Sequence, residues 1–379
     1  MGVCELFRLG HMTDFRLPPE LQPSDGRFGC GPSKIRQEQI DHLVAHAHLL
    51  GTSHRQQPVR ELVARVREGL ADLFRLPDGY EVVLGNGGST AFWDAAAFSL
   101  IDTRSAHLSF GEFGQKFVNA ARAPWLTAPA VIHGAPGTVS SFAGDEDADV
   151  FAYPHNETST GAMAEVTRQG SPGSLTVVDA TSAAGGIDID VTETDVYYFA
   201  PQKNFASDGG LWFALMSPAA TERIGRIAAS DRYIPEFLSL SVALENSRLD
   251  QTLNTPAIAT LLLMDSQVQW IRDSGGLAWA GARTKESSDL IYAWADAHPN
   301  ATPFVAQPEH RSQVVTTIDF DDTIDASRVS AMLRANGIVD IDPYRKLGRN
   351  QLRVATFTAI EPSDVSLLLG AIDAAVDAL

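Results

Sequence analysis

A lysine and an aspartate, each placed just after a strand-like run, carry the strongest chemical signal in this sequence. Lys203 follows the apolar run of residues 196–199, and Asp179 directly follows the run of residues 175–178. A lysine amine can form a Schiff base with an aldehyde, and a carboxylate can keep a ring nitrogen protonated. This order predicts a site for pyridoxal 5′-phosphate (PLP), in which Lys203 bonds the aldehyde and Asp179 pairs with the ring.

Neither residue by itself is specific evidence for a PLP site. An aspartate at a strand end more often caps a helix, and most lysines are solvated surface groups. To act as a base, Lys203 needs a lowered pKa, which burial beside other cations would supply. The joint order of glycine turn, aspartate and lysine is far more specific than any one part.

A glycine-rich turn upstream adds a place for an anion. Residues 84–93 read Leu-Gly-Asn-Gly-Gly-Ser-Thr-Ala-Phe-Trp, between a strand-like run and a helix-like run. The N–H groups near Ser89 and Thr90, together with the helix dipole, suit a phosphate. The alternative is an ordinary tight turn in which Ser89 or Thr90 caps the helix. The turn is neither a Walker loop nor a dinucleotide fingerprint.

Two further positions could contact a pyridine ring. Thr158, with Asn156 and Glu157 before it, follows the strand-like run of residues 149–153 and could bond a ring hydroxyl. Phe113 could stack on the ring, although an aromatic side chain there is more often part of the core. An ordinary polar turn explains Thr158 equally well.

Cationic side chains in loops could bind the anionic groups of a substrate, since arginine forks suit carboxylate and phosphate. These candidates are His54, Arg55, Arg345 and Arg353. The alternative for each is a solvated surface cation. Asn254 and Thr255 precede Pro256 and a long apolar helix, a pattern that predicts Asn254 as the N-cap and Pro256 as the first helical residue.

The elements that must position these residues alternate along the chain. Apolar periodicity predicts helices at 38–50, 59–74, 90–100 and 114–122, and strands at 80–84, 106–109, 149–153, 175–178, 195–199 and 211–216. Alternation of this kind predicts a mostly parallel sheet with helices on both faces and a ligand at the carboxyl ends of its strands.

A smaller α+β domain is expected at the C-terminal end. It would contain strands at 313–320 and 352–357, a helix at 325–336 that stops at Gly337, and a final helix at 362–379. We therefore predict an N-terminal segment at 1–27 that packs with the small domain, a large domain at 28–281 and a small domain at 282–379. Residues 1–12 read as a tag or an upstream start.

Composition limits the partners and the compartment. The formal net charge of −18 over 379 residues argues against nucleic acid and anionic membranes. No apolar run is long enough to span a bilayer, and no signal peptide is evident. The two cysteines, Cys4 and Cys30, cannot build a disulfide framework or a cysteine metal site. We expect a cytoplasmic protein without a metal.

Taken together, these stretches resemble the phosphoserine aminotransferase family of class V, fold-type I PLP enzymes, from residue 26 to the C-terminus. The resemblance rests on residues 26–34, 53–55, 87–90, 155–158, 179–182, 200–204, 254–256 and 343–353. It implies the α/β fold of PLP-dependent transferases, with a mostly parallel sheet between helices and a small C-terminal domain. It also implies a homodimer with shared active sites.

The resemblance implies a role for each candidate. Lys203 would bond PLP and carry a proton between the substrate's α-carbon and the cofactor, and Asp179 would pair with the pyridine nitrogen. Thr158 would contact the ring hydroxyl and Phe113 would stack on the ring. The cofactor phosphate would be held by Ser89, Thr90 and Gln202, and by Asn254 and Thr255 of the neighbouring subunit. The distal anion of the substrate would be bound by Arg55 with His54, and by Arg345, and its α-carboxylate by Arg353.

Several positions depart from the commoner family pattern. Many members have Trp where this chain has Phe113, Gly-Arg where it has Ser89-Thr90, and His where it has Tyr344. These changes remove cations from the expected phosphate pocket, and Lys346 or Arg349 could replace them.

The resemblance implies amino transfer between O-phospho-L-serine and 2-oxoglutarate in L-serine biosynthesis, with a second role in pyridoxine biosynthesis. One alternative is another class V aminotransferase of the alanine–glyoxylate type. A second is a phosphate-binding α/β protein without PLP, and a third is a purely structural dimer. A cysteine desulfurase is disfavoured, because that class needs a mobile nucleophilic cysteine in its catalytic half and both Cys4 and Cys30 are misplaced for this role.

Overall fold

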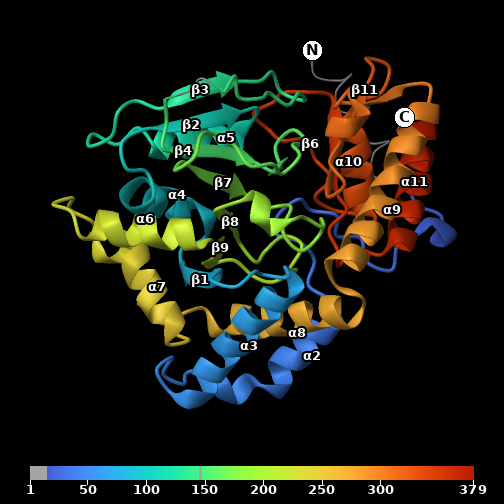
Figure 1. Ribbon diagram of the computed structural model, residues 1–379. Coiled ribbons are helices and arrows are strands. Elements are labelled where there is room, and N and C mark those ends of the chain that lie inside the picture. Colours follow the sequence, from blue (N-terminus) through green and yellow to red (C-terminus); the bar gives the residue numbers. More distant parts are fainter. Residues whose placement is uncertain (1–14, 145–146) are drawn as a thin grey trace, which may run out of the picture.

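A seven-stranded sheet forms the centre of the larger part of the chain (Figure 1). The computed structural model describes residues 15–144 and 147–379, so the predictions for residues 1–12 lie outside it. The strand order is β1 (Glu81–Asn86), β9 (Leu211–Met216), β8 (Val196–Phe199), β7 (Leu175–Asp179), β4 (Val150–Pro154), β2 (Ser105–Ser109) and β3 (Ala130–His133). Within this sheet only β9 runs in the direction opposite to the other six strands, which confirms the mostly parallel sheet.

Helices cover both faces of this sheet. One face packs against α4 (Gly88–Ser99), α5 (Glu112–Ala120), α6 (Pro218–Ala228) and α7 (Leu240–Arg248). The other face packs against α3 (Gln57–Leu73) and α8 (Ile258–Asp273), with α2 (Gln37–Ala45) outside α8. Because successive strand side chains point to opposite faces, Tyr197 and Tyr198 enter different hydrophobic clusters. Burying each such aromatic side chain contributes about 1.5–3 kcal/mol.

The C-terminal part forms a three-stranded antiparallel sheet with helices, coloured orange to red in Figure 1. It contains α9 (Gly276–Ala297), β10 (Ala301–Pro303), β11 (Val315–Phe320), α10 (Ala326–Ala335), β12 (Gln351–Ala355) and α11 (Pro362–Asp377). Asp325 caps α10, and Gly337 follows it with a positive φ of 85°. The division between residues 281 and 282 falls within α9, and it remains a proposal.

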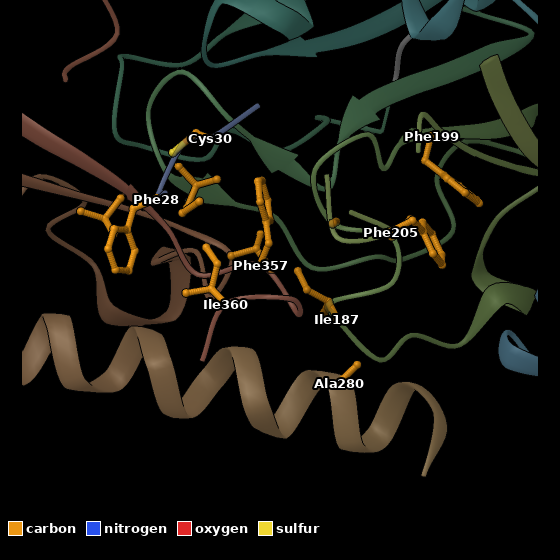
Figure 2. Packing of buried hydrophobic residues seen from close by; sticks show 14 of the residues in the cluster. Phe28, Cys30, Ile187, Phe199, Phe205, Ala280, Phe357 and Ile360 are labelled. Carbon is orange, nitrogen blue, oxygen red and sulfur yellow. The ribbon is translucent and has the colours of Figure 1, made fainter. Parts of the chain in front are cut away.

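The N-terminal segment runs from this small sheet toward the large one. Leu17 N–H donates to Asn336 Oδ1 at 3.0 Å, and Ala355 N–H donates to the carbonyl of Phe28 at 2.9 Å. Figure 2 shows Phe28 and Cys30 beside Phe357 and the neighbouring Ile360, with α9 running beneath them. These residues share one buried cluster with Phe199 and Phe205 of the large sheet region. The core therefore continues between the two parts of the chain.

The prediction for the start of α8 is wrong. The helix begins at Ile258 with Ala257 as its N-cap, and Asn254 and Thr255 are exposed in the turn before it. The carbonyl of Thr255 accepts a hydrogen bond from Asn86 Nδ2 at 3.1 Å, and the carbonyl of Asn254 accepts one from Thr252 Oγ1 at 2.5 Å. Since both carbonyls are bonded outside the helix, the helix starts later.

None of the helices formed by residues 15–144 and 147–379 is both long and apolar enough to cross a membrane.

Candidate active site

A cavity of about 240 Å³ lies where the strands of the large sheet end. Its walls come from the segments that follow β1, β2, β4, β7 and β8, which places the cavity at the edge that the sequence predicted. Seven of the predicted site residues line it together: Ser89, Thr90, Phe113, Thr158, Asp179, Gln202 and Lys203. The fold thus brings side chains more than one hundred positions apart into one space.

Lys203 is a buried amine. It is 9% exposed, and its Nζ donates to the carbonyl of Cys30 at 2.5 Å. Burial lowers the pKa of Lys203 to about 8, because the charged form loses its solvation. A Cβ on Gly31, whose φ is +142°, would lie 1.8 Å from this Nζ, so a side chain at that position would displace the amine. A neutral, nucleophilic amine at moderate pH is what imine chemistry needs.

Asp179 is held in one orientation at the end of β7. Its Oδ1 accepts from Thr181 N–H at 2.9 Å and from Thr181 Oγ1 at 2.5 Å, and its Oδ2 accepts from Trp93 Nε1 at 3.3 Å. Burial raises the pKa of Asp179, and these hydrogen bonds oppose that rise. No helix starts here, so Asp179 is not a helix cap. A fixed, buried carboxylate suits a cationic ring nitrogen.

The glycine turn leaves the start of α4 open. Gly87 is the N-cap with φ +106° and Gly88 follows with φ +69°, so Ser89 and Thr90 lie inside the first turn. Among the described residues no side chain caps this helix. Ser89 Oγ instead shares a 2.7 Å hydrogen bond with Thr181 Oγ1. The N–H groups of the first turn are therefore available to an anion, as one of the two alternatives from the sequence requires.

Polar atoms without partners also mark the cavity. Thr158 Oγ1 and Asn156 Nδ2 each donate to Ser182 Oγ at 2.8 Å. Within the part of the chain that the structure describes, Asn156 Oδ1 and Gln202 Oε1 are buried and have no hydrogen-bond partner. Unsatisfied buried acceptors are costly in a folded protein, so these two oxygens suit hydrogen bonds from a ligand. Together with the amine, the carboxylate and the open helix start, this set of groups fits PLP.

A buried glutamate positions Phe113. Glu157 Oε2 accepts from the N–H groups of Phe113 at 3.1 Å and Gly114 at 3.0 Å, at the start of α5. Its other oxygen accepts from Ser159 Oγ at 2.6 Å. Burial raises the pKa of Glu157. This carboxylate ties the helix that carries Phe113 to the segment that carries Thr158.

Arg353 lies beside the cavity. Its Nη1 donates to the carbonyl of Thr158 at 2.9 Å, and its guanidinium lies 5.3 Å from the ring centroid of Tyr344. Its Nε is buried and unpaired among residues 15–144 and 147–379. Arg345 is exposed, and it makes no hydrogen bond or ion pair with any described residue. Both side chains retain donors for a ligand.

His54 and Arg55 are not among the cavity-lining residues. Arg55 Nη1 donates to Gln251 Oε1 at 2.5 Å, and His54 Nδ1 lies 3.2 Å from Thr255 Oγ1. With Asn254 and Thr255, they form a partly exposed group outside the cavity walls. Below, this group is called the outer group.

The two cations suggested as replacements already have partners. Lys346 forms an ion pair with Glu112, and Arg349 forms one with Asp319. Neither presents a free cation to the cavity.

Two cavity side chains, Trp93 and Thr181, were missed by the sequence reasoning, as was Gly210 before β9. Trp93 lies one helical turn after Ser89 and Thr181 lies two residues after Asp179. Both spacings could have signalled them, because such positions face the same side as the residue they follow or bond to it directly.

The family model for class-V aminotransferases matches residues 141–340. A phosphoserine aminotransferase from Corynebacterium glutamicum is 58% identical over 370 residues, covering 97% of this chain and 98% of that protein. The chain belongs to the phosphoserine aminotransferase family. It is thus a class V aminotransferase, and the predicted family and fold class are confirmed.

Solved structures show the same fold at low sequence identity. The phosphoserine aminotransferase from Cytophaga hutchinsonii has a TM-score of 0.84 and 21% identity, covering 92% of this chain and 99% of that one. An alanine–glyoxylate aminotransferase from Nostoc has a TM-score of 0.79 and 19% identity, covering 95% and 97%. The fold alone therefore does not separate these two families, whereas the 58% identity does.

Proposed function

We propose that the protein is a PLP-dependent phosphoserine aminotransferase. It would convert O-phospho-L-serine and 2-oxoglutarate to 3-phosphooxypyruvate and L-glutamate, as a step of L-serine biosynthesis. The observation that carries the proposal is the shared cavity of a buried amine, a fixed carboxylate and an uncapped helix start, in a chain of this family. PLP supplies an electron sink for negative charge at the substrate's α-carbon.

Each end of the cofactor has residues suited to hold it. The N–H groups at the start of α4, with Ser89 and Thr90, would bind its phosphate. Asp179 would hold a proton on the ring nitrogen, and Thr158 would contact the ring hydroxyl. Phe113, fixed by Glu157, would pack against the ring. Gln202 carries one of the unpaired buried oxygens in the cavity.

Lys203 would move the proton in the amino transfer. Its Nζ would take the proton from the substrate's α-carbon and deliver it to the cofactor. A pKa of about 8 leaves a useful fraction of the amine neutral near neutral pH while keeping it basic enough to take a proton. Burial in the cavity also keeps water from competing for that proton.

Arginine side chains would select the substrate. Arg353, with its unpaired Nε, would bind the α-carboxylate that all amino donors share. Arg345 and the outer-group pair His54 and Arg55 would bind the distal phosphate or carboxylate. In this arrangement the reaction centre and the selecting cations come from different segments of the chain.

The test of this function is a donor panel. With 2-oxoglutarate as acceptor, phosphoserine should be converted with a kcat/KM at least about tenfold above those of alanine and serine, because only phosphoserine uses the distal cations. The protein should be yellow, and borohydride should abolish its visible band. Equal use of alanine would favour the alanine–glyoxylate type. A colourless protein that added PLP does not reconstitute would contradict PLP chemistry altogether.

We also propose that the protein is a homodimer in which Asn254 and Thr255 complete the partner's phosphate site. Two exposed aromatic side chains support an interface, since Tyr233 is 81% exposed and Phe237 is 51% exposed. Phe237 approaches within 3.8 Å of the Cβ position of Gly87 in the glycine turn. Exposed apolar groups beside an active site are typical of protein interfaces.

Subunit mixing tests the shared site. Lys203→Ala and the double variant Asn254→Ala/Thr255→Ala should each be inactive alone. After mixing, unfolding and refolding, hybrid dimers would hold one intact site, which would restore roughly a quarter of wild-type activity. Each variant refolded alone is the control. No recovery in the mixture, with dimers present, would contradict shared sites.

Three further assignments are also proposals. The large and small domains would comprise residues 28–281 and 282–379, and limited proteolysis followed by mass mapping tests that division. The cytoplasm would be the compartment, since the two cysteines fit a reducing environment, and fractionation tests it. A second role in pyridoxine biosynthesis would be tested by growth without pyridoxine in a host that lacks its own enzyme of this family.

A further inference from the structure

Trp93 contacts the carboxylate of Asp179, and no role in binding or catalysis has been assigned to it above. It lies on α4, is 5% exposed and lines the cavity. Its Nε1 donates to Tyr198 Oη at 2.7 Å and to Asp179 Oδ2 at 3.3 Å. One indole N–H is therefore shared by two buried polar groups, the Tyr198 hydroxyl and the Asp179 carboxylate.

The contact completes a chain of hydrogen bonds across the cavity wall. Ser89 Oγ bonds Thr181 Oγ1, and Thr181 bonds Asp179 Oδ1 through its N–H and its hydroxyl. On the other oxygen, Oδ2, Trp93 Nε1 donates at 3.3 Å, and the hydroxyl of Tyr198 also bonds the Asp179 carboxylate. Both carboxylate oxygens are thus held, one by a polar turn and one by an indole.

We propose that Trp93 is a positioning residue, whose indole N–H holds Asp179 Oδ2 in the orientation that pairs with the pyridine ring nitrogen. The proposal rests on the proposed function, because it assigns the ring nitrogen of PLP to Asp179. Trp93 would act on the carboxylate and not on the cofactor directly.

The physical reason is rotation of a buried carboxylate. Without the indole donor, Oδ2 would be buried with less compensation, which favours either a protonated acid or a rotated side chain. Burial already raises the pKa of Asp179, and the hydrogen bonds from Thr181, Tyr198 and Trp93 act against that rise. A charged and fixed Asp179 binds a cationic ring nitrogen more strongly than a neutral or mobile one.

The packing offers a matched control in the same core. Trp212 on β9 is 4% exposed and belongs to the same hydrophobic cluster as Trp93. Its ring packs edge-on against Phe92, with centroids 5.1 Å apart, and within the described residues it makes no hydrogen bond with Asp179. Trp212→Phe therefore removes the same atoms from the same cluster without changing the carboxylate's hydrogen bonds.

The first experiment uses the cofactor-free protein and does not depend on the proposed function. The chain has six tryptophans, and the indole signal of Trp93 in a ¹⁵N spectrum is the one lost in Trp93→Phe. The signal of Trp212 is identified in the same way. Asp179→Asn should shift the Trp93 indole signal and leave that of Trp212 in place. An unmoved Trp93 signal would overturn the contact.

The second experiment measures PLP affinity. Trp93→Phe should raise the dissociation constant for PLP about five- to tenfold, as expected for one weak hydrogen bond to a charged group. Trp212→Phe should lower the melting temperature of the cofactor-free protein similarly and leave the PLP affinity within about twofold. Equal weakening in both variants, or none in Trp93→Phe, would overturn the positioning role. Failure of the wild-type protein to bind PLP would instead contradict the proposed function, while the indole result would still stand.

Discussion

The cavity around Lys203 and the cations around it are built in opposite ways. Lys203 and Asp179 are buried and held by side chains and carbonyls of their own chain. Arg345 and Arg55 are exposed, and Arg55 contacts an exposed turn instead of the cavity wall. In the cavity, most polar groups of Lys203 and Asp179 already have partners. Among the outer cations, the described residues leave the donors of Arg345 available to a ligand.

This difference separates reactivity from selectivity. A buried amine acquires its lowered pKa from desolvation, which requires the core to enclose it. Cations that recognise a phosphate must stay hydrated until the substrate arrives, so they are placed on exposed segments. We therefore expect changes in the cavity to abolish the reaction and changes in the outer cations to alter its preference among donors.

The largest expected effect comes from a substitution in the cavity. Lys203→Ala should lower kcat by roughly 10³-fold or more and remove the visible band that borohydride reduces, because both the bonding amine and the base are lost. The matched control is Lys285→Ala, which removes an exposed lysine paired with Asp289. Retention of more than a tenth of the activity in Lys203→Ala would refute the role of Lys203.

A smaller effect is expected at the border between the two regions. Arg353→Ala should lower kcat/KM by about 10- to 100-fold for every amino donor, because each donor carries an α-carboxylate. The control is Arg349→Ala, an arginine of the same domain that is paired with Asp319 and should stay within about twofold of wild type. A loss confined to phosphoserine would mean that Arg353 binds the phosphate instead.

A substitution in the outer group should change the preference among substrates more than the rate of the reaction itself. Arg55→Ala should lower kcat/KM about tenfold for phosphoserine and for 2-oxoglutarate, and should leave alanine as a donor nearly unaffected. Arg60→Ala is the control, since Arg60 bonds the carbonyl of Leu249 and carries no predicted substrate role. Equal losses with all donors would show that Arg55 is structural.

The smallest effect is a pH-dependent change in stability. Burial lowers the pKa of Lys203 from 10.5 to about 8, so protonation of this amine favours the unfolded chain. The free energy of unfolding is therefore unaffected by this group above pH 10.5, falls as pH decreases, and has lost the full contribution below pH 8. Lys203→Met should therefore raise the melting temperature of the cofactor-free protein at pH 7, and the gain should shrink as pH rises to 10. Thermal melts from pH 6 to 10 measure this, with Lys285→Met as the control. A gain independent of pH would contradict the lowered pKa.

Much of the architecture could be predicted because apolar periodicity is a local property. The predicted strand at residues 211–216 and the predicted stop of the helix at Gly337 agree with the structure. The short edge strand β3 was not predicted, since its residues are partly exposed and its apolar pattern is weak. The N-cap prediction at Asn254 failed because a hydrogen bond from Asn86, far away in the sequence, holds the turn that precedes the helix.

The sequence by itself determined the order of the candidate site residues along the chain: a glycine turn, then Asp179, then Lys203, each after an apolar run. Only the tertiary structure decided that these residues share one cavity, that Lys203 is buried, and that Trp93 touches Asp179 while Arg55 stays outside the cavity walls. The physical reason is that strand order, burial and long-range hydrogen bonds depend on contacts between distant segments. Residue type and local spacing do not specify those contacts.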